Sequence, residues 1–167
     1  MSAIPYGRQA IDDDDIEAVV TALRSAWLTT GPTVGRFEER LQDTTGCPHA
    51  VAVSNGTAAL HCAVAAFDVG PGDEVITSPL TFASTANVVV HCGATPVFAD
   101  VEPDTFNLSA ERFAAAITPR TKAVIPVHLF GQSCDMDAIS AIARKHGIAV
   151  IEDAAHEIGR ASCRERV

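Results

Sequence analysis

The chain has 167 residues, of which 47% are hydrophobic and 20% are charged, values that are typical of a soluble globular domain. Its formal net charge is −9 and its pI is near 5.0. Nucleic-acid-binding domains concentrate Lys and Arg on one face, so we expect no nucleic-acid partner. No stretch approaches the roughly 18 apolar residues of a membrane span, and the opening MSAIPYGRQA lacks a signal-peptide pattern, so we expect a cytoplasmic protein with no membrane partner.

The five cysteines show no CxxC spacing. Four of them lie in apolar or turn segments that are typical of buried thiols. We therefore expect neither a structural zinc site nor a disulfide framework among Cys47, Cys62, Cys92, Cys134 and Cys163.

Two amphipathic helices are predicted at the start of the chain. Acidic residues 12–15 precede apolar residues spaced at i, i+3, i+4 and i+7, and acids suit the positive end of a helix dipole. A second helix follows a Gly-Pro break and carries Val34, Phe37 and Leu41 on one face. Residues 1–46 are therefore predicted to form an N-terminal helical segment.

From residue 49 onward, short β-rich runs alternate with segments of helical period. This alternation predicts an α/β fold with a mostly parallel sheet, and the continuous apolar runs indicate helices on both faces of that sheet. The expected strands are 49–53, 74–78, 95–100, 123–131 and 148–153, and the expected helices are 57–67, 81–93, 109–117 and 136–147.

Residues 157–167 break this pattern. Three arginines crowd into this segment of an otherwise acidic chain, and no apolar period is present. We expect a truncated chain with a non-native tail here, and the alternative is a native terminus.

Ligands of an open α/β sheet bind outside the carboxyl ends of its strands. The turn Ser54–Leu60 opens an Ala-rich helix, so its backbone N–H groups are candidates for binding a phosphate, although an ordinary capped turn has the same pattern. Phe82 is a candidate for stacking on a planar cofactor, and the alternative is a core phenylalanine.

Two more strand ends carry polar residues. Asp153 ends a strand, where its carboxylate could pair with a cationic ring nitrogen, while His156 could approach a neighbouring oxygen. A solvated aspartate is also common at a strand end. His128 is predicted to be a hydrogen-bonded structural group or a pocket wall rather than a ligand contact.

Five motifs, in order, resemble the N-terminal half of the large domain of the DegT-like sugar aminotransferases, which have the pyridoxal phosphate (PLP) fold type I. The resemblance spans residues 4–156 and implies that 47–156 form an incomplete PLP-binding large domain. The motifs are SNGTAAL, GDEVITSPLTFASTANVV, GATPVFADVEPDTFNL, TPRTKAVIPVHLFGQSCDMDAI and IEDAAH.

This resemblance also implies the cofactor contacts. Three residues would hold the PLP phosphate, an aromatic ring would cover the pyridine, an aspartate would pair with the protonated ring nitrogen, and a histidine would lie near the phenolic oxygen. These residues are, in the same order, Gly56, Thr57, Ala58, Phe82, Asp153 and His156.

The opening of the chain is similar to family members that make the amino sugar precursor of pseudaminic acid by acting at C4 of a UDP-linked keto sugar. In that subgroup a tyrosine near the N-terminus and the LTTGP loop line the sugar-nucleotide pocket. The alternative for the loop is a helix-ending turn. The implied substrate residues are Tyr6, Leu28, Thr29, Thr30 and Gly31.

The family's catalytic lysine has no counterpart in this sequence. In the family, a lysine on a later strand forms a Schiff base with PLP and moves the proton. This chain contains only Lys122 and Lys145, and neither matches that lysine. We therefore expect the 167-residue chain to be inactive, and poorly soluble because strand edges of a partial sheet are exposed.

The resemblance implies a homodimeric parent enzyme that takes an amino group from an amino acid, glutamate by resemblance, and transfers it to a keto sugar nucleotide. Three alternatives stay open. One is a sugar dehydratase of the same family, in which histidine replaces the lysine, and another is a non-catalytic binding module. The third is a nucleotide-binding Rossmann domain, which is disfavoured because its glycine fingerprint is missing.

Overall fold

The computed structural model describes residues 9–156, and the chain divides after Ala52 into two units. Each unit is described by itself. Tyr6 and the predicted tail at 157–167 lie outside the described residues. Within the described part of the chain, no helix has the length and apolar character needed to cross a membrane.

The first unit contains the two predicted helices, α1 (Asp13–Arg24) and α2 (Pro32–Thr45). Asp12 and Asp15 form a capping box at the start of α1, in which each carboxylate accepts the other residue's backbone N–H at 3.0 and 3.2 Å. Helix α2 begins at a proline and is followed by Gly46, whose φ of 75° is the left-handed conformation of a common helix terminus. Both predicted helices are confirmed.

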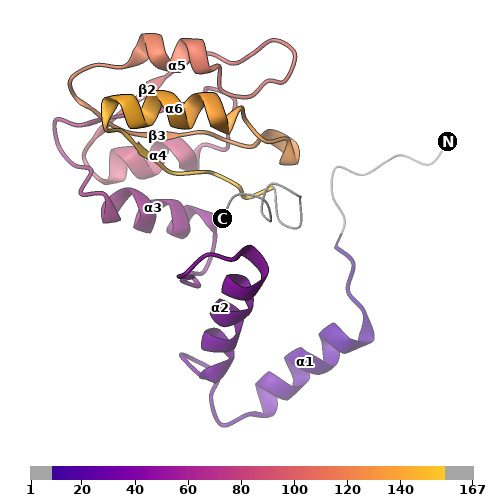
Figure 1. Cartoon of the computed structure of the whole chain (residues 1–167). Helices are drawn as coiled ribbons and strands as arrows, with labels where there is room; N and C mark the ends of the chain where they lie inside the picture. The colour runs from indigo at the N-terminus through magenta and orange to yellow at the C-terminus, as the bar shows by residue number, and fades with distance from the viewer. Residues whose placement is uncertain (1–8, 157–167) are drawn as a thin grey trace. The chain divides into compact units, whose positions relative to one another are not determined.

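The second unit is an α/β layer structure (Figure 1). The four strands among its described residues, 53–156, are all parallel and lie in the order β2-β1-β3-β4. Its elements are α3 (Gly56–Ala66), β1 (Glu74–Thr77), α4 (Ser84–His91), β2 (Thr95–Phe98), α5 (Ala110–Ala116), β3 (Thr121–Ile125), the 3-10 turn η1 (Leu129–Gly131), α6 (Met136–His146) and β4 (Ala149–Val150).

Helices cover both faces of this sheet. Successive residues of a strand point to opposite faces, so Val75 and Ile76 of β1 enter two different cores. Val75 packs with residues of α3 and α4, whereas Ile76 packs with residues of α5 and α6. The predicted parallel sheet with helices on both faces is therefore confirmed.

The strand predicted at residues 49–53 is wrong. The structure has no strand there, and Val51 and Val53 are exposed. A strand exists only through its ladder partners, and within residues 9–156 this segment has none. The N–H of Ala52 donates instead to the carboxylate of Glu38 at 2.8 Å.

The expectation of buried thiols is wrong for two cysteines. Of the four cysteines among the described residues, Cys134 is buried and Cys92 is half-buried, whereas Cys47 and Cys62 are exposed. Cys62 lies on α3 between Leu60 and Val64, which face the core. Because a helix turns about 100° per residue, the residue between two core positions four apart points outward.

A buried carboxylate lies at the amino-terminal edge of the sheet. Glu74, the first residue of β1, is only 5% exposed, and it binds the Thr118 hydroxyl and the Arg120 guanidinium. The guanidinium Nε lies 3.0 Å from the Glu74 carboxylate. The hydrogen bond from Thr118, and to a smaller extent the one from Arg120, holds the pKa of Glu74 below its ordinary value.

Glu74→Gln is expected to destabilise the chain at neutral pH and to have a smaller effect in acid. Because the folded-state pKa of Glu74 is depressed, its stabilising contribution is present above the unfolded pKa and is lost as the pH falls below 4.5 through the folded pKa. Urea unfolding at a series of pH values measures the difference. Glu111→Gln, on the exposed surface of α5, is the control. A difference between wild type and Glu74→Gln that does not change with pH would contradict this assignment.

Candidate functional site

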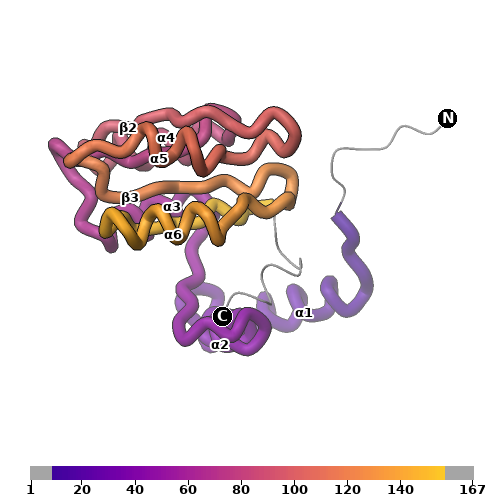
Figure 2. The backbone as a smooth tube through the Cα atoms, turned by 45° about the horizontal axis from the view of Figure 1, so that its top comes forward, coloured from indigo at the N-terminus to yellow at the C-terminus, as the bar shows by residue number. Residues whose placement is uncertain are grey.

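The candidate site lies at the carboxyl-terminal edge of the parallel sheet. The segments that follow β2 and β3 turn at the same end of the second unit (Figure 2), and β4 is parallel to β3, so it ends at that edge too. Helices α3 and α4 begin at this edge as well, because α3 runs toward the start of β1 and α4 follows its end. The topology therefore brings the predicted cofactor residues of the second unit to one edge.

Asp153 is held at this edge by the backbone. It forms a parallel bridge with Val127 beyond the end of β4. Its N–H donates to the Pro126 carbonyl at 2.9 Å, and its carbonyl accepts the N–H of His128 at 3.1 Å. These bonds fix the backbone of Asp153 at the sheet edge, and the residue is only 8% exposed.

The Asp153 carboxylate is oriented by a threonine pair. The Thr85 hydroxyl lies 2.8 Å from Oδ2 of Asp153 and 2.7 Å from the Thr81 hydroxyl. Because Thr85 has one hydroxyl proton and donates it to the carboxylate, Thr81 must donate to Thr85. The other oxygen, Oδ1, accepts only a long 3.4 Å bond from the Ala155 N–H among the described residues, so it retains acceptor capacity.

Sequence reasoning missed Thr85. The available signal was a polar residue four positions after Thr81, at the start of the helix that follows a predicted strand. That signal does not identify the partner, since Thr85 and Asp153 are 68 residues apart in sequence.

Thr85→Val is expected to lower the free energy of unfolding by about 1–3 kcal/mol, because it leaves a buried carboxylate oxygen without its donor. Valine keeps the shape of threonine, so a cavity does not account for the loss. Thr85→Ser is the matched control, since it restores the hydroxyl. Urea unfolding of the three chains measures the effect, and equal stability of the Val and Ser variants would refute the role of the hydroxyl.

The start of α3 has room for an anion. Asn55 caps the helix by accepting the Ala58 N–H at 2.9 Å. The N–H groups of Gly56 and Thr57 have no partner among the described residues, and both residues are exposed. A Cβ built on Gly56 would meet nothing within 4 Å. Ala58 differs from Gly56 and Thr57 as a predicted phosphate contact, because its N–H already donates to the Asn55 side chain.

Phe82 is exposed rather than buried. It lies between β1 and α4 and is 77% exposed, so the alternative of a core phenylalanine is wrong. His156 lies three residues after Asp153, and its ring stacks on that of Phe130 with a centroid separation of 6.3 Å and an interplanar angle of 7°. The cofactor contacts of Phe82 and His156 stay predictions.

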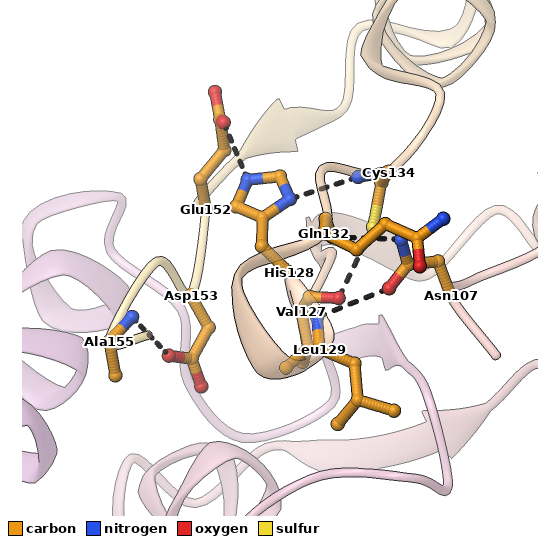
Figure 3. Close-up of polar contacts among 9 residues, drawn as sticks. All are labelled: Asn107, Val127, His128, Leu129, Gln132, Cys134, Glu152, Asp153 and Ala155. Carbon is orange, nitrogen blue, oxygen red and sulfur yellow. Dashed lines mark hydrogen bonds and ion pairs between the residues drawn. The ribbon is translucent and has the colours of Figure 1, made fainter. Parts of the chain in front are cut away.

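His128 is the structural group that its position predicted (Figure 3). It is fully buried, and its Nδ1 accepts the Cys134 N–H at 3.1 Å. In the neutral form the ring proton therefore resides on Nε2, and this nitrogen lies 2.8 Å from the Glu152 carboxylate. Both ring nitrogens are committed to protein partners.

Both lysines lie at the opposite edge of the sheet. Lys122 is near the start of β3, where its Nζ binds the Asp68 carbonyl and lies 3.3 Å from the Asp73 carboxylate. Lys145 is in the last turn of α6, next to the start of β4. Neither ammonium is therefore placed to act beside Asp153, as the sequence predicted.

The predicted substrate residues of the first unit form the turn between α1 and α2. Leu28, Thr29 and Thr30 precede Gly31, the N-cap of α2. A Cβ built on Gly31 would lie 2.8 Å from the Cβ of Trp27, so this close approach requires glycine. The helix-ending turn is thus present, and contact with substrate stays a prediction for these residues.

Comparison with known sequences identifies relatives. A sequence model described as the DegT/DnrJ/EryC1/StrS aminotransferase family matches residues 9–167. The chain is 55% identical over 155 residues to the spore coat polysaccharide biosynthesis protein SpsC of Bacillus subtilis. That similarity covers 93% of this chain and 40% of SpsC.

Solved structures of similar sequence share the fold. The aminotransferase from Psychrobacter cryohalolentis has a TM-score of 0.86 at 41% identity, over 93% of this chain and 40% of that chain. Spr1654 of Streptococcus pneumoniae, assigned as a sugar aminotransferase, has TM-scores of 0.88 in its PMP form and 0.87 in its PLP form, at 37% and 36% identity. These cover 94% and 93% of this chain, and 43% and 44% of Spr1654. The chain thus spans about 40% of the length of SpsC and of the Psychrobacter enzyme.

Proposed function

The chain belongs to the DegT/DnrJ/EryC1/StrS aminotransferase family, and from this we propose that it is the cofactor-binding part of a PLP-dependent sugar-nucleotide aminotransferase. One observation carries the proposal. The buried Asp153 carboxylate has Oδ2 bound by Thr85 and acceptor capacity left on Oδ1, at the same sheet edge as the open start of α3. The PLP and PMP forms of Spr1654 support the same cofactor.

The residues present fit PLP. The N–H groups of Gly56 and Thr57, with the Thr57 hydroxyl, would bind the phosphate at the positive end of α3. Asp153 would hold the proton on the ring nitrogen, and the exposed ring of Phe82 would cover one face of the pyridine. When bound, PLP with a protonated ring nitrogen acts as an electron sink at the reacting carbon.

Asp153 is suited to this task because its position is fixed before a cofactor binds. The ladder bonds to Pro126 and His128 fix its backbone, and the Thr85 hydroxyl fixes its carboxylate. A preorganised, buried charge stabilises a cation more strongly than one that must reorient from solvent. His156, held against Phe130, would lie near the phenolic oxygen of the cofactor.

The proposed reaction moves an amino group from glutamate to a keto sugar nucleotide, giving 2-oxoglutarate and the amino sugar nucleotide. We assign the sugar as a UDP-linked 4-keto-6-deoxy amino sugar of the kind that leads to pseudaminic acid. The similarity to SpsC, a polysaccharide biosynthesis protein, supports sugar chemistry. Tyr6 and the turn Leu28, Thr29, Thr30 and Gly31 are the proposed substrate contacts, and a homodimer is the proposed assembly.

The proton-moving lysine would be supplied by a part of the complete protein outside these 167 residues, since Lys122 and Lys145 lie at the opposite edge. We therefore propose that the 167-residue chain does not turn over substrate by itself.

The test uses the complete protein with PLP, glutamate and the UDP-linked 4-keto sugar, and identifies the products by mass spectrometry. The proposal expects equal amounts of 2-oxoglutarate and amino sugar nucleotide. A sugar product that lacks a hydroxyl and has gained no nitrogen would indicate a dehydratase instead. Neither product, with no PLP bound, would indicate a non-catalytic module.

A further inference from the structure

We propose that Asn107 is a positioning residue that clamps the η1 turn and thereby holds the Phe130 ring against His156 at the edge of the cofactor site. The clamp itself is a feature of this chain, and its relevance to catalysis rests on the proposed function. Asn107 and Phe130 both lie within the sequence motifs described above, but those motifs did not predict a role for either residue.

Asn107 bonds both ends of the turn (Figure 3). Its Oδ1 accepts the Leu129 N–H at 3.1 Å, and its Nδ2 donates to the Gln132 carbonyl at 2.9 Å. The residue is only 3% exposed, so water does not compete for these bonds. One side-chain amide therefore spans the three-residue turn.

The backbone of Asn107 is also held by hydrogen bonds. The Asn107 carbonyl accepts the Glu102 N–H at 2.9 Å, and its N–H donates to the Thr105 hydroxyl at 3.3 Å. The antiparallel bridge between Val101 and Leu108 closes this segment. The amide thus reaches the turn from a fixed backbone.

The turn needs such a clamp because Phe130 has a left-handed backbone, with φ 52° and ψ 27°. This conformation is unfavourable for a residue other than glycine, so neighbouring bonds must maintain it. The Phe130 ring is 68% exposed, and burial in the core therefore does not fix its direction. The backbone of the turn sets the position from which the Phe130 ring reaches His156.

The stacked pair connects the clamp to the site. The two rings are almost parallel, with an interplanar angle of 7° and centroids 6.3 Å apart, within the range of favourable aromatic contacts. His156 is three residues from Asp153, whose carboxylate already accepts the N–H of Ala155. A shift of the turn would move the surface on which the His156 ring rests.

Only an amide of this length satisfies both partners. One bond needs an acceptor and the other needs a donor, and asparagine supplies both. An aspartate would place a second acceptor against the Gln132 carbonyl, while the Leu129 bond is kept. Asn107→Asp is therefore a substitution that breaks one half of the clamp with little change in volume.

The first test is NMR of the complete protein without cofactor and with labelled histidine, reading the ring-current shift of the His156 ring protons, assigned with His156→Gln. We expect Asn107→Asp to reduce this shift toward the value in Phe130→Ala. Asn87→Asp, at an exposed position on α4, should leave it unchanged. An unchanged shift in a folded Asn107→Asp chain overturns the proposal.

A measurement on the wild-type chain covers the case in which the variant does not fold. The clamp predicts slow hydrogen exchange at the Leu129 amide and a nuclear Overhauser contact between the Phe130 and His156 rings. Absence of either one overturns the proposal without any substitution.

The second test uses the complete protein with PLP. Asn107→Asp is expected to lower kcat by about 10- to 100-fold with little change in the KM for the amino donor, because the group that it misplaces does not bind the donor. Unchanged kcat overturns the positioning role. If the NMR result appears but the complete protein binds no PLP, the proposed function fails while the clamp stands.

Discussion

Replacing Asp153 with asparagine in the complete protein is expected to lower transamination by about 10²- to 10³-fold, the usual cost of removing one preorganised electrostatic partner. Asparagine still accepts the Thr85 hydrogen bond and keeps the shape of aspartate, so the loss isolates the charge. A neutral amide cannot hold the proton on the ring nitrogen of the cofactor.

The assay is the rate of 2-oxoglutarate formation from glutamate with the keto sugar nucleotide. Asp104→Asn, at an exposed turn, is the matched control and should retain the wild-type rate. A retained rate in Asp153→Asn, or an equal loss in both variants, would contradict the assignment of Asp153.

Replacing Phe113 with alanine is expected to lower the free energy of unfolding of the chain by about 3–5 kcal/mol. Phe113 is fully buried on α5, and its core cluster joins that helix to Ile139 and Ala143 of α6 and to Ile76 of the sheet. Truncation removes its transfer free energy and leaves a cavity between the layers. The expected loss is a large fraction of the roughly 5–15 kcal/mol that stabilises a domain.

Urea unfolding followed by circular dichroism measures this change. Phe67→Ala, which removes the same ring from a half-exposed position after α3, should cost much less. Equal losses for the two variants would show that Phe113 does not join α5 and α6 to the sheet in the core that contains Ile76.

Much of the fold is predictable from the sequence because its signals are local. The acidic residues at the start of α1 and the Gly-Pro break before α2 are each recognised within a few residues. The continuous apolar runs of β1 and β3 indicate burial on both faces. The alternation of these runs with helical segments predicts the parallel sheet.

The strands that the sequence does not predict correctly depend on pairing with residues that are distant in sequence. The run at 49–53 has strand composition, yet pairing makes a strand, and this segment has no partner within residues 9–156. The run at 148–153 pairs over only two residues in β4 before the bridge at Asp153.

The same limit applies to the site. Asp153 can be predicted as a site residue because it follows a strand, and Gly56 because it begins a helix. The topology of a parallel sheet brings such positions to one edge. Thr85 and Asn107 are not found in this way, since each acts through hydrogen bonds to residues distant in sequence. A polar residue becomes informative only when its buried partner is known.

The most direct measurement is the ¹⁵N chemical shift of the ring nitrogen of labelled PLP bound to the complete protein. It reports whether that nitrogen carries a proton. We predict a protonated ring nitrogen at neutral pH in the wild type and an unprotonated one in Asp153→Asn. An unprotonated nitrogen in the wild type, or one that stays protonated after the substitution, would contradict the proposal that Asp153 holds the charged ring.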